Sequence, residues 1–260
     1  MNTFRFTIYS LVAAIMIMLS GCAQTDITQE MRMAVQATKQ KQYAEAAKHA
    51  EICLNYDNTL TDAVILYNYC TFLSDTRENV RRQAIYNLAK LTRISPESYP
   101  AWLFYGWVLV ENKQYTDAIE PLEKALELIP KNAPSLPSLR LLLGICYVNN
   151  NLQTKALGIL QPLQAKQPYQ TWPELYNCLG ILAIQRQSYD TAVAFFKCGL
   201  NFDPRNDVLL QNLAVTHDLY RNDPASAKKE YVACLIQKNA AGDMDSCRKI
   251  QNRLRRISKK

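Results

Sequence analysis

Residues 99–130 read YPAWLFYGWVLVENKQYTDAIEPLEKALELIP, and two short helices can be drawn through this stretch. The first covers about 101–111 and the second about 115–128, with a polar turn between them. Their inner faces carry residues at three- and four-residue spacing, namely Trp102, Tyr105, Gly106, Leu109, Ala118, Leu122 and Ala125. Gly106 and Ala118 are small where two antiparallel helices must approach closely, so the stretch predicts a helical hairpin.

The order tryptophan, Tyr-Gly, alanine, leucine, alanine and a terminal proline resembles the tetratricopeptide repeat (TPR), whose period is about 34 residues. Gly144 and Gly180 take the glycine position in the next two copies, and weaker copies lie on both sides. The resemblance implies six repeats, at about 27–60, 65–98, 99–132, 137–170, 173–206 and 207–240. The sixth copy has one extra residue in its inner turn. An irregular helical bundle is the alternative to this interpretation.

We therefore expect an all-α protein, a TPR solenoid in which antiparallel helix pairs form a right-handed superhelix. Seven glycines and the absence of bounded Val/Ile/Thr runs leave little material for a sheet. A basic capping helix is expected at 243–260, where Met244, Cys247, Ile250, Leu254 and Ile257 have helical spacing. Its seven basic residues equal the net charge of +7 for the whole chain. This basic face could be solvated, or could meet anionic lipid or an acidic partner.

The first residues resemble a bacterial lipoprotein signal. A positive start and an apolar run end in Leu19-Ser20-Gly21-Cys22, which matches the lipobox. The resemblance implies a signal peptide over 1–21, cleavage before Cys22, lipid on that cysteine and a tether over 22–28. Ala23, instead of aspartate, favours the outer membrane facing the periplasm. An ordinary secretory signal with a chance cysteine is the alternative.

Seven further cysteines follow, six in the repeats and Cys247 in the expected capping helix. In an oxidising exported compartment we expect disulfides between residues equidistant from a helix turn. The expected pairs are Cys53 with Cys70, Cys178 with Cys198, and Cys234 with Cys247. The alternative is that cysteine merely replaces alanine as a small buried residue.

No catalytic motif is present. The chain has no Gly-x-Ser-x-Gly, phosphate-loop, His-Glu-x-x-His or dinucleotide-binding pattern, and it has two histidines. We therefore expect a non-enzymatic protein without a metal or another cofactor, and export argues against nucleic acid as a ligand.

In TPR proteins the first helix of each repeat lines a concave groove. The resemblance places these residues there: Met31, Val35, Tyr69, Leu73, Leu103, Trp107, Val110, Leu141, Ile145, Val148, Asn177, Ile181, Ile184, Gln185, Gln211 and Val215. This groove is apolar in the middle and rich in amides toward its C-terminal end. We expect an apolar or amphipathic protein segment as its ligand, with Trp107 exposed as an anchor and Trp102 packed between helices.

The architecture resembles TPR lipoproteins of bacterial envelopes, among them the pilotin-type proteins of type IV pili. The resemblance implies a lipid-anchored scaffold that supports assembly of an outer-membrane, pilus or secretion complex. The alternative function is an adaptor that recruits periplasmic enzymes such as peptidoglycan hydrolases.

Overall fold

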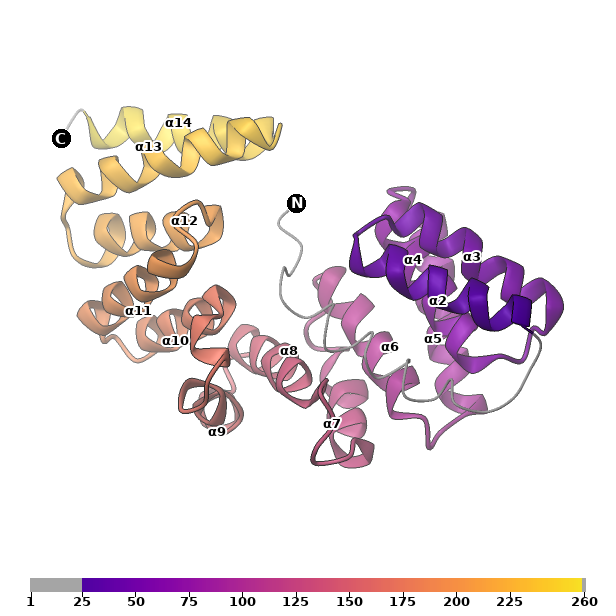
Figure 1. Ribbon diagram of the computed structural model, residues 1–260. Helices are drawn as coiled ribbons and strands as arrows, with labels where there is room; N and C mark the ends of the chain where they lie inside the picture. The colour runs from indigo at the N-terminus through magenta and orange to yellow at the C-terminus, as the bar shows by residue number, and fades with distance from the viewer. Residues whose placement is uncertain (1–24, 259–260) are drawn as a thin grey trace. The chain divides into compact units, whose positions relative to one another are not determined.

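The protein is all-α. A computed structural model describes residues 25–258, and thirteen α-helices, with no strand, make up this described part (Figure 1). Each helix packs against the next along the chain within the two compact units defined below. The pairwise packing is consistent with a TPR solenoid and confirms the predicted fold class. The predicted signal peptide, Cys22 and most of the tether lie outside the described residues.

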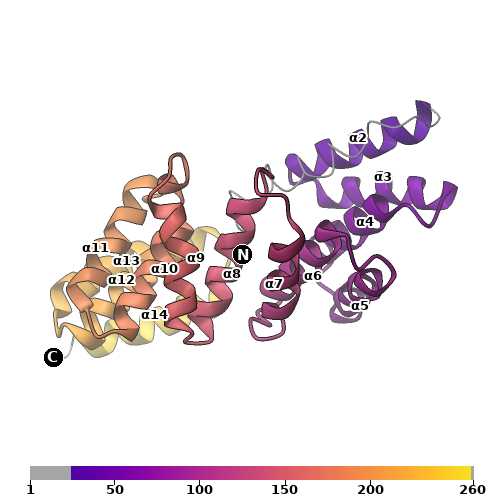
Figure 2. The same cartoon turned by 90° about the horizontal axis from the view of Figure 1, so that it is seen from below.

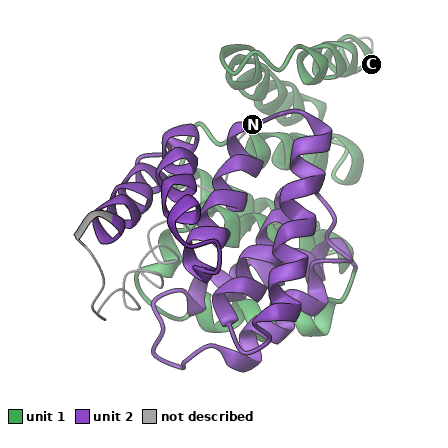
Figure 3. Ribbon diagram, turned by 90° about the vertical axis from the view of Figure 1, so that its right-hand side faces the viewer, with its two compact units in different colours: residues 1, 151–260 green, residues 2–150 purple. Residues whose placement is uncertain are grey.

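The chain divides into two compact units, with the boundary in the turn at residues 150–151 (Figure 3). The described part of the N-terminal unit is residues 25–150. It contains α2 (Thr25–Lys39), α3 (Tyr43–Tyr56), α4 (Thr61–Ser74), α5 (Glu78–Ile94), α6 (Tyr99–Glu111), α7 (Ile119–Leu128) and α8 (Leu136–Asn149).

The described part of the C-terminal unit is residues 151–258. It contains α9 (Gln153–Gln164), α10 (Pro173–Gln185), α11 (Tyr189–Phe202), α12 (Asp207–Val215), α13 (Pro224–Ala240) and α14 (Met244–Ile257). A short 3-10 helix, η2 (Tyr169–Thr171), precedes α10, and a π-helical turn, η3 (Thr216–Tyr220), follows α12. Figure 2 shows α10, α11 and α12 side by side.

The glycines of the first helices mark the points of closest approach. A Cβ atom on Gly106 would lie 2.6 Å from the side chain of Leu122 in α7, and one on Gly180 would lie 2.3 Å from the ring of Phe196 in α11. These distances are shorter than van der Waals contact allows, so a side chain at either position would force its neighbour to shift. The small residue of the predicted pattern thus fixes how closely each pair packs.

The inner turns share one backbone conformation. Lys41, Lys113 and Gln187 are left-handed, with φ of 61°, 62° and 60°. In each turn the following amide donates to a carbonyl of the first helix at 2.8–2.9 Å, as in a Schellman motif. The same local geometry therefore recurs from pair to pair, as repeats require.

Two predicted helix starts are wrong. The second helix of 99–130 begins at Ile119 rather than at 115, because Pro121 has no N–H with which to bond the carbonyl of Asp117. The repeat expected over 65–98 has its first helix beginning at Thr61, so the residues between 60 and 65, which fall between the predicted repeats, belong to α4.

The extra residue of the last copy is absorbed by the π-helical turn η3. The amide of Arg221 donates to the carbonyl of Thr216 at 3.1 Å, one residue further than an α-helix would allow. The turn also positions Asp218, which accepts from Nη2 of Arg253 in α14 at 2.8 Å and from its Nε.

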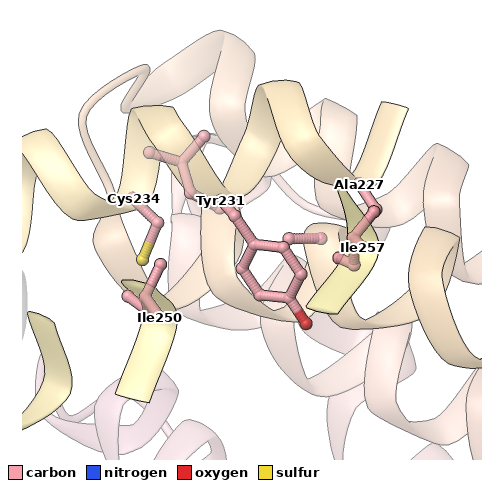
Figure 4. Close-up of a cluster of buried hydrophobic side chains, with 7 residues drawn as sticks. Ala227, Tyr231, Cys234, Ile250 and Ile257 are labelled. Carbon is pink, nitrogen blue, oxygen red and sulfur yellow. The ribbon is translucent and has the colours of Figure 1, made fainter. Parts of the chain in front are cut away.

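The end of the chain closes over its own apolar cluster. Side chains of α12, α13 and α14 pack together there, with Ala227, Tyr231, Cys234, Ile250 and Ile257 at the centre (Figure 4). In addition, Lys238 of α13 pairs with Asp207 at 2.6 Å and with Asp243 at 3.4 Å. Helix α14 is therefore held to the last pair by packing and by ion pairs. Of the described helices, none combines the length and apolar character that crossing a bilayer requires.

The glycine contacts predict opposite effects for two equivalent substitutions. Gly180→Ala should destabilise the protein by about 1–3 kcal/mol, because the new methyl group overpacks against Phe196. Gly158→Ala, in α9, should stabilise it by about 0.5–1 kcal/mol, because nothing lies within 4 Å of the new methyl group and alanine favours a helix. Urea unfolding measures both, and equal stabilities of the two variants would contradict the close packing.

Candidate protein-binding surface

The predicted groove residues of the N-terminal unit are mostly core. Tyr69, Leu103, Trp107, Val110, Leu141, Ile145 and Val148 are buried, as are Met31 and Val35, whereas Leu73 is half-buried. The prediction of an exposed apolar groove with Trp107 as its anchor is therefore wrong for this unit. A side chain that is 1% exposed cannot contact a ligand.

Trp107 is buried because the first helices also pack against one another. Its ring lies 4.9 Å from that of Tyr69 in α4 and 5.8 Å from that of Phe104, measured between centroids. Tyr69 in turn meets Phe104 edge-on at 4.9 Å. By contrast, Trp102 is half-buried and donates from Nε1 to the carbonyl of Pro96 at 2.8 Å. Trp107 is therefore the more deeply buried of the two tryptophans, contrary to the expectation from the repeat pattern.

One carboxyl group lies beside the aromatic cluster. Glu111 accepts from Nε1 of Trp107 at 3.2 Å. Burial raises the pKa of Glu111, although the Trp107 hydrogen bond and the Arg81 charge oppose this rise. Burial also raises the pKa of Tyr43 to about 12, with further contributions from Cys70 and Glu111. The cluster disfavours negative charge, which is consistent with a structural role.

The C-terminal unit keeps part of the predicted groove accessible. Asn177, Ile181, Ile184 and Gln185 of α10 are half-buried. On α12, Val208 is 40% exposed, Gln211 is exposed, and Asn212 and Val215 are half-buried. These eight residues follow three- and four-residue spacing on each helix, and we call them the inner strip.

A hydrogen bond joins the two halves of the inner strip. Nδ2 of Asn212 donates to Oδ1 of Asn177 at 2.6 Å, and the two residues are 35 positions apart. The bond aligns two first helices so that their accessible side chains form one surface. This surface carries amide and aliphatic groups and no ionisable side chain. Asn212 and Val208 were not among the predicted site residues, and the recurrence of asparagine at nearly one repeat length was the signal for Asn212.

No disulfide forms among the described residues, where all seven cysteines carry thiols. The predicted pairs are wrong because equal distance from a turn does not determine where a side chain points. Sγ of Cys53 faces the carbonyl of Ile27 at 3.8 Å, whereas Sγ of Cys70 lies 3.3 Å from Oγ1 of Thr38, at the other end of α2.

The other two predicted pairs are also free thiols. Cys178 is buried and Cys198 is exposed, so they face different surroundings. Cys234 donates to the carbonyl of Asp207 at 3.4 Å. Burial raises the pKa of Cys70 and of Cys146 to about 12, so these thiols stay protonated near neutral pH.

No protein-family model matches this chain. Among curated proteins, the peroxisomal targeting signal receptor of Saccharomyces cerevisiae is 20% identical over 161 aligned residues, which cover 46% of this chain. The match spans 26% of that receptor, about a quarter of its length.

Solved structures share the fold. The Cut9–Hcn1 hetero-tetramer of APC/C matches with a TM-score of 0.72 and 16% identity, covering 97% of this chain and 46% of that one. PilW, a type IV pilus biogenesis factor, matches with a TM-score of 0.65 and 17% identity over 81% of this chain and 92% of its own. YrrB, a TPR protein with an unusual peptide-binding site, matches with a TM-score of 0.51 and 20% identity, over 74% and 94%.

The recurring hairpins, the glycine contacts and these likenesses together define a protein of the tetratricopeptide-repeat fold. Because the sequence identities to these solved structures are 20% or lower, the structural matches show the fold that this chain shares with them and nothing about its function.

The burial of the two tryptophans predicts an order of stabilities. Trp107→Ala should lower the free energy of unfolding by about 3–5 kcal/mol, because it empties a space beside the buried rings of Tyr69 and Phe104. Trp102→Ala should cost less, because that side chain is already partly in water. Denaturant titration of both variants decides the order, and a larger loss for Trp102→Ala would restore the assignment made from the repeat pattern.

The buried carboxyl predicts a pH dependence. Because the folded-state pKa of Glu111 lies above its ordinary value of 4.5, the folded state binds the proton more tightly than the unfolded chain does. The contribution of Glu111 to stability is therefore lost as pH rises above 4.5 and through the folded-state pKa. Glu111→Gln keeps an oxygen for Trp107 and does not titrate, so its stability relative to the wild type should be higher at pH 8 than at pH 4. A difference that does not change with pH would show that this carboxyl does not titrate abnormally.

Proposed function

We propose that this protein is a non-enzymatic scaffold that binds segments of other proteins on the inner strip of α10 and α12. Supporting this proposal, the TPR fold is typically that of non-enzymatic scaffolds. YrrB, which this chain resembles in fold, is described as having a peptide-binding site. The peroxisomal protein, which it resembles over part of its sequence, is named as a receptor for a targeting signal.

The observation that carries the proposal is the composition of the inner strip. Ile181, Ile184 and Val215 offer half-buried apolar contact, and Asn177 and Asn212 offer amide groups beside it. Main-chain N–H and C=O groups of a bound segment need hydrogen-bond partners when they leave water, and amides supply both donors and acceptors. Because the strip has no charged group, we expect a neutral, apolar or amphipathic segment as its ligand.

We further propose that the scaffold is anchored by lipid on Cys22 in a bacterial envelope, at the outer membrane facing the periplasm. The lipobox-like Leu19-Ser20-Gly21-Cys22 supports this location. A likeness in fold to PilW supports a part in assembling an outer-membrane, pilus or secretion complex. A single acyl chain binds a membrane only marginally, so we expect lipidated Cys22 to carry more than one acyl chain.

The inner strip predicts the effect of one substitution on partner capture. Ile184→Glu places a charge in the apolar part of the strip and should weaken partner binding by about 2 kcal/mol or more if this position is an anchor. Affinity capture of the acylated protein from membranes, followed by mass spectrometry, gives the measurement. The matched control is Ile94→Glu on α5, where the wild-type side chain is 67% exposed and outside the strip.

The captured proteins also discriminate between functions. A secretin, barrel or pilus component lost only with Ile184→Glu supports the assembly scaffold, whereas soluble peptidoglycan hydrolases would support the adaptor. Equal loss with both variants, or with neither, would move binding away from the inner strip. In the same preparation Cys22→Ala should lose label from a palmitate analogue, and equal label would exclude Cys22 as the anchor.

A further inference from the structure

The last two helices form a second surface, which the inner strip does not include. A groove of about 340 Å³ runs between α13 and α14. Its lining includes Leu235, Ile236, Asn239, Met244, Arg248 and Gln251, and Cys247, which is 4% exposed, forms part of its floor.

The groove has an exposed apolar rim. Ile236 is 60% exposed and Met244 is 62% exposed, one on each helix. Val232, one turn before Ile236 on α13, is 43% exposed. Large apolar side chains that are more than half in water on both sides of a groove form a surface suited to a partner.

The charges beside the groove are mostly basic. Arg255 follows Arg248 by seven residues and so lies on the same side of α14, and Lys228 and Lys229 precede Val232 on α13. All four are exposed, and among the described residues none of them forms an ion pair. Asp207 and Asp243 pair with Lys238, and Asp218 pairs with Arg253. Asp245, exposed in the first turn of α14, is a carboxylate beside the four basic residues that no ion pair engages among the described residues.

We propose that this groove, lined by α13 and α14, binds an acidic amphipathic helix of a partner protein. The apolar residues of such a helix would enter between Ile236 and Met244, and its carboxylates would meet Arg248, Arg255 and the two lysines. Helix-in-groove recognition uses apolar anchors at three- and four-residue spacing, and charge complementarity adds specificity and speed of association. The proposal stands independently of the inner strip.

An anionic bilayer shares the charge preference but fits the shape less well. A bilayer surface meets side chains that project from a helix, whereas part of the apolar lining here is recessed between two helices, with Cys247 at its floor. A helix can insert side chains into such a recess.

The test uses the full chain and two synthetic peptides. One is an amphipathic helical peptide with leucine on one face and glutamate on the other, and the second carries lysine in place of glutamate. Measured by fluorescence anisotropy, the acidic peptide should bind at least about tenfold more tightly than the lysine peptide. Added salt should lower the affinity of the acidic peptide. Arg248→Glu with Arg255→Glu should reduce its affinity by about tenfold or more, as should Ile236→Ser with Met244→Ser.

The matched control changes the same charge on the same helix. Lys249→Glu with Arg256→Glu alters the outer face of α14 and should change affinity by less than about threefold. Circular dichroism confirms that each variant is folded. Equal losses for the two charge-reversal variants, or equal binding of the two peptides, would overturn the proposal. Binding to phosphatidylglycerol vesicles without binding of the acidic peptide would also overturn it, in favour of a membrane surface.

Discussion

The architecture depends on a single kind of contact, in which a residue without a side chain in one helix meets a large side chain of its partner. Gly106 meets Leu122 and Gly180 meets Phe196, each closer than a methyl group would allow. This contact fixes the rotation of the first helix within its pair. Once that rotation is fixed, the opposite face of the first helix is set as well, and that face either packs on the neighbouring first helix or faces solvent.

Local pattern predicted the helices because helical periodicity and small-residue positions are properties of neighbouring residues. Burial of the opposite face was not predictable in the same way, because it depends on a helix one repeat away. Trp107 is covered by Tyr69 of α4, whereas Ile184 remains half-buried on α10. Side-chain direction also decides whether two cysteines can form a disulfide. Cys53 and Cys70 face opposite ends of α2 and therefore stay apart.

Two surfaces follow from this packing. The inner strip on α10 and α12 is neutral and is aligned by the bond between Asn177 and Asn212. The groove of α13 and α14 is apolar at its rim and basic along its sides. A scaffold with one neutral and one basic surface can hold two partners of different chemistry at once, and it needs no reactive group to do so.

The proposed function requires that a partner segment binds on the first-helix face of the C-terminal unit. Site-specific photo-crosslinking in the intact cell tests it most directly, with benzoylphenylalanine placed at Gln211 in the inner strip or at Tyr86, a 61% exposed position on α5. We expect a discrete crosslinked partner from position 211 and none from position 86. A partner crosslinked from position 86 and not from position 211 would contradict it.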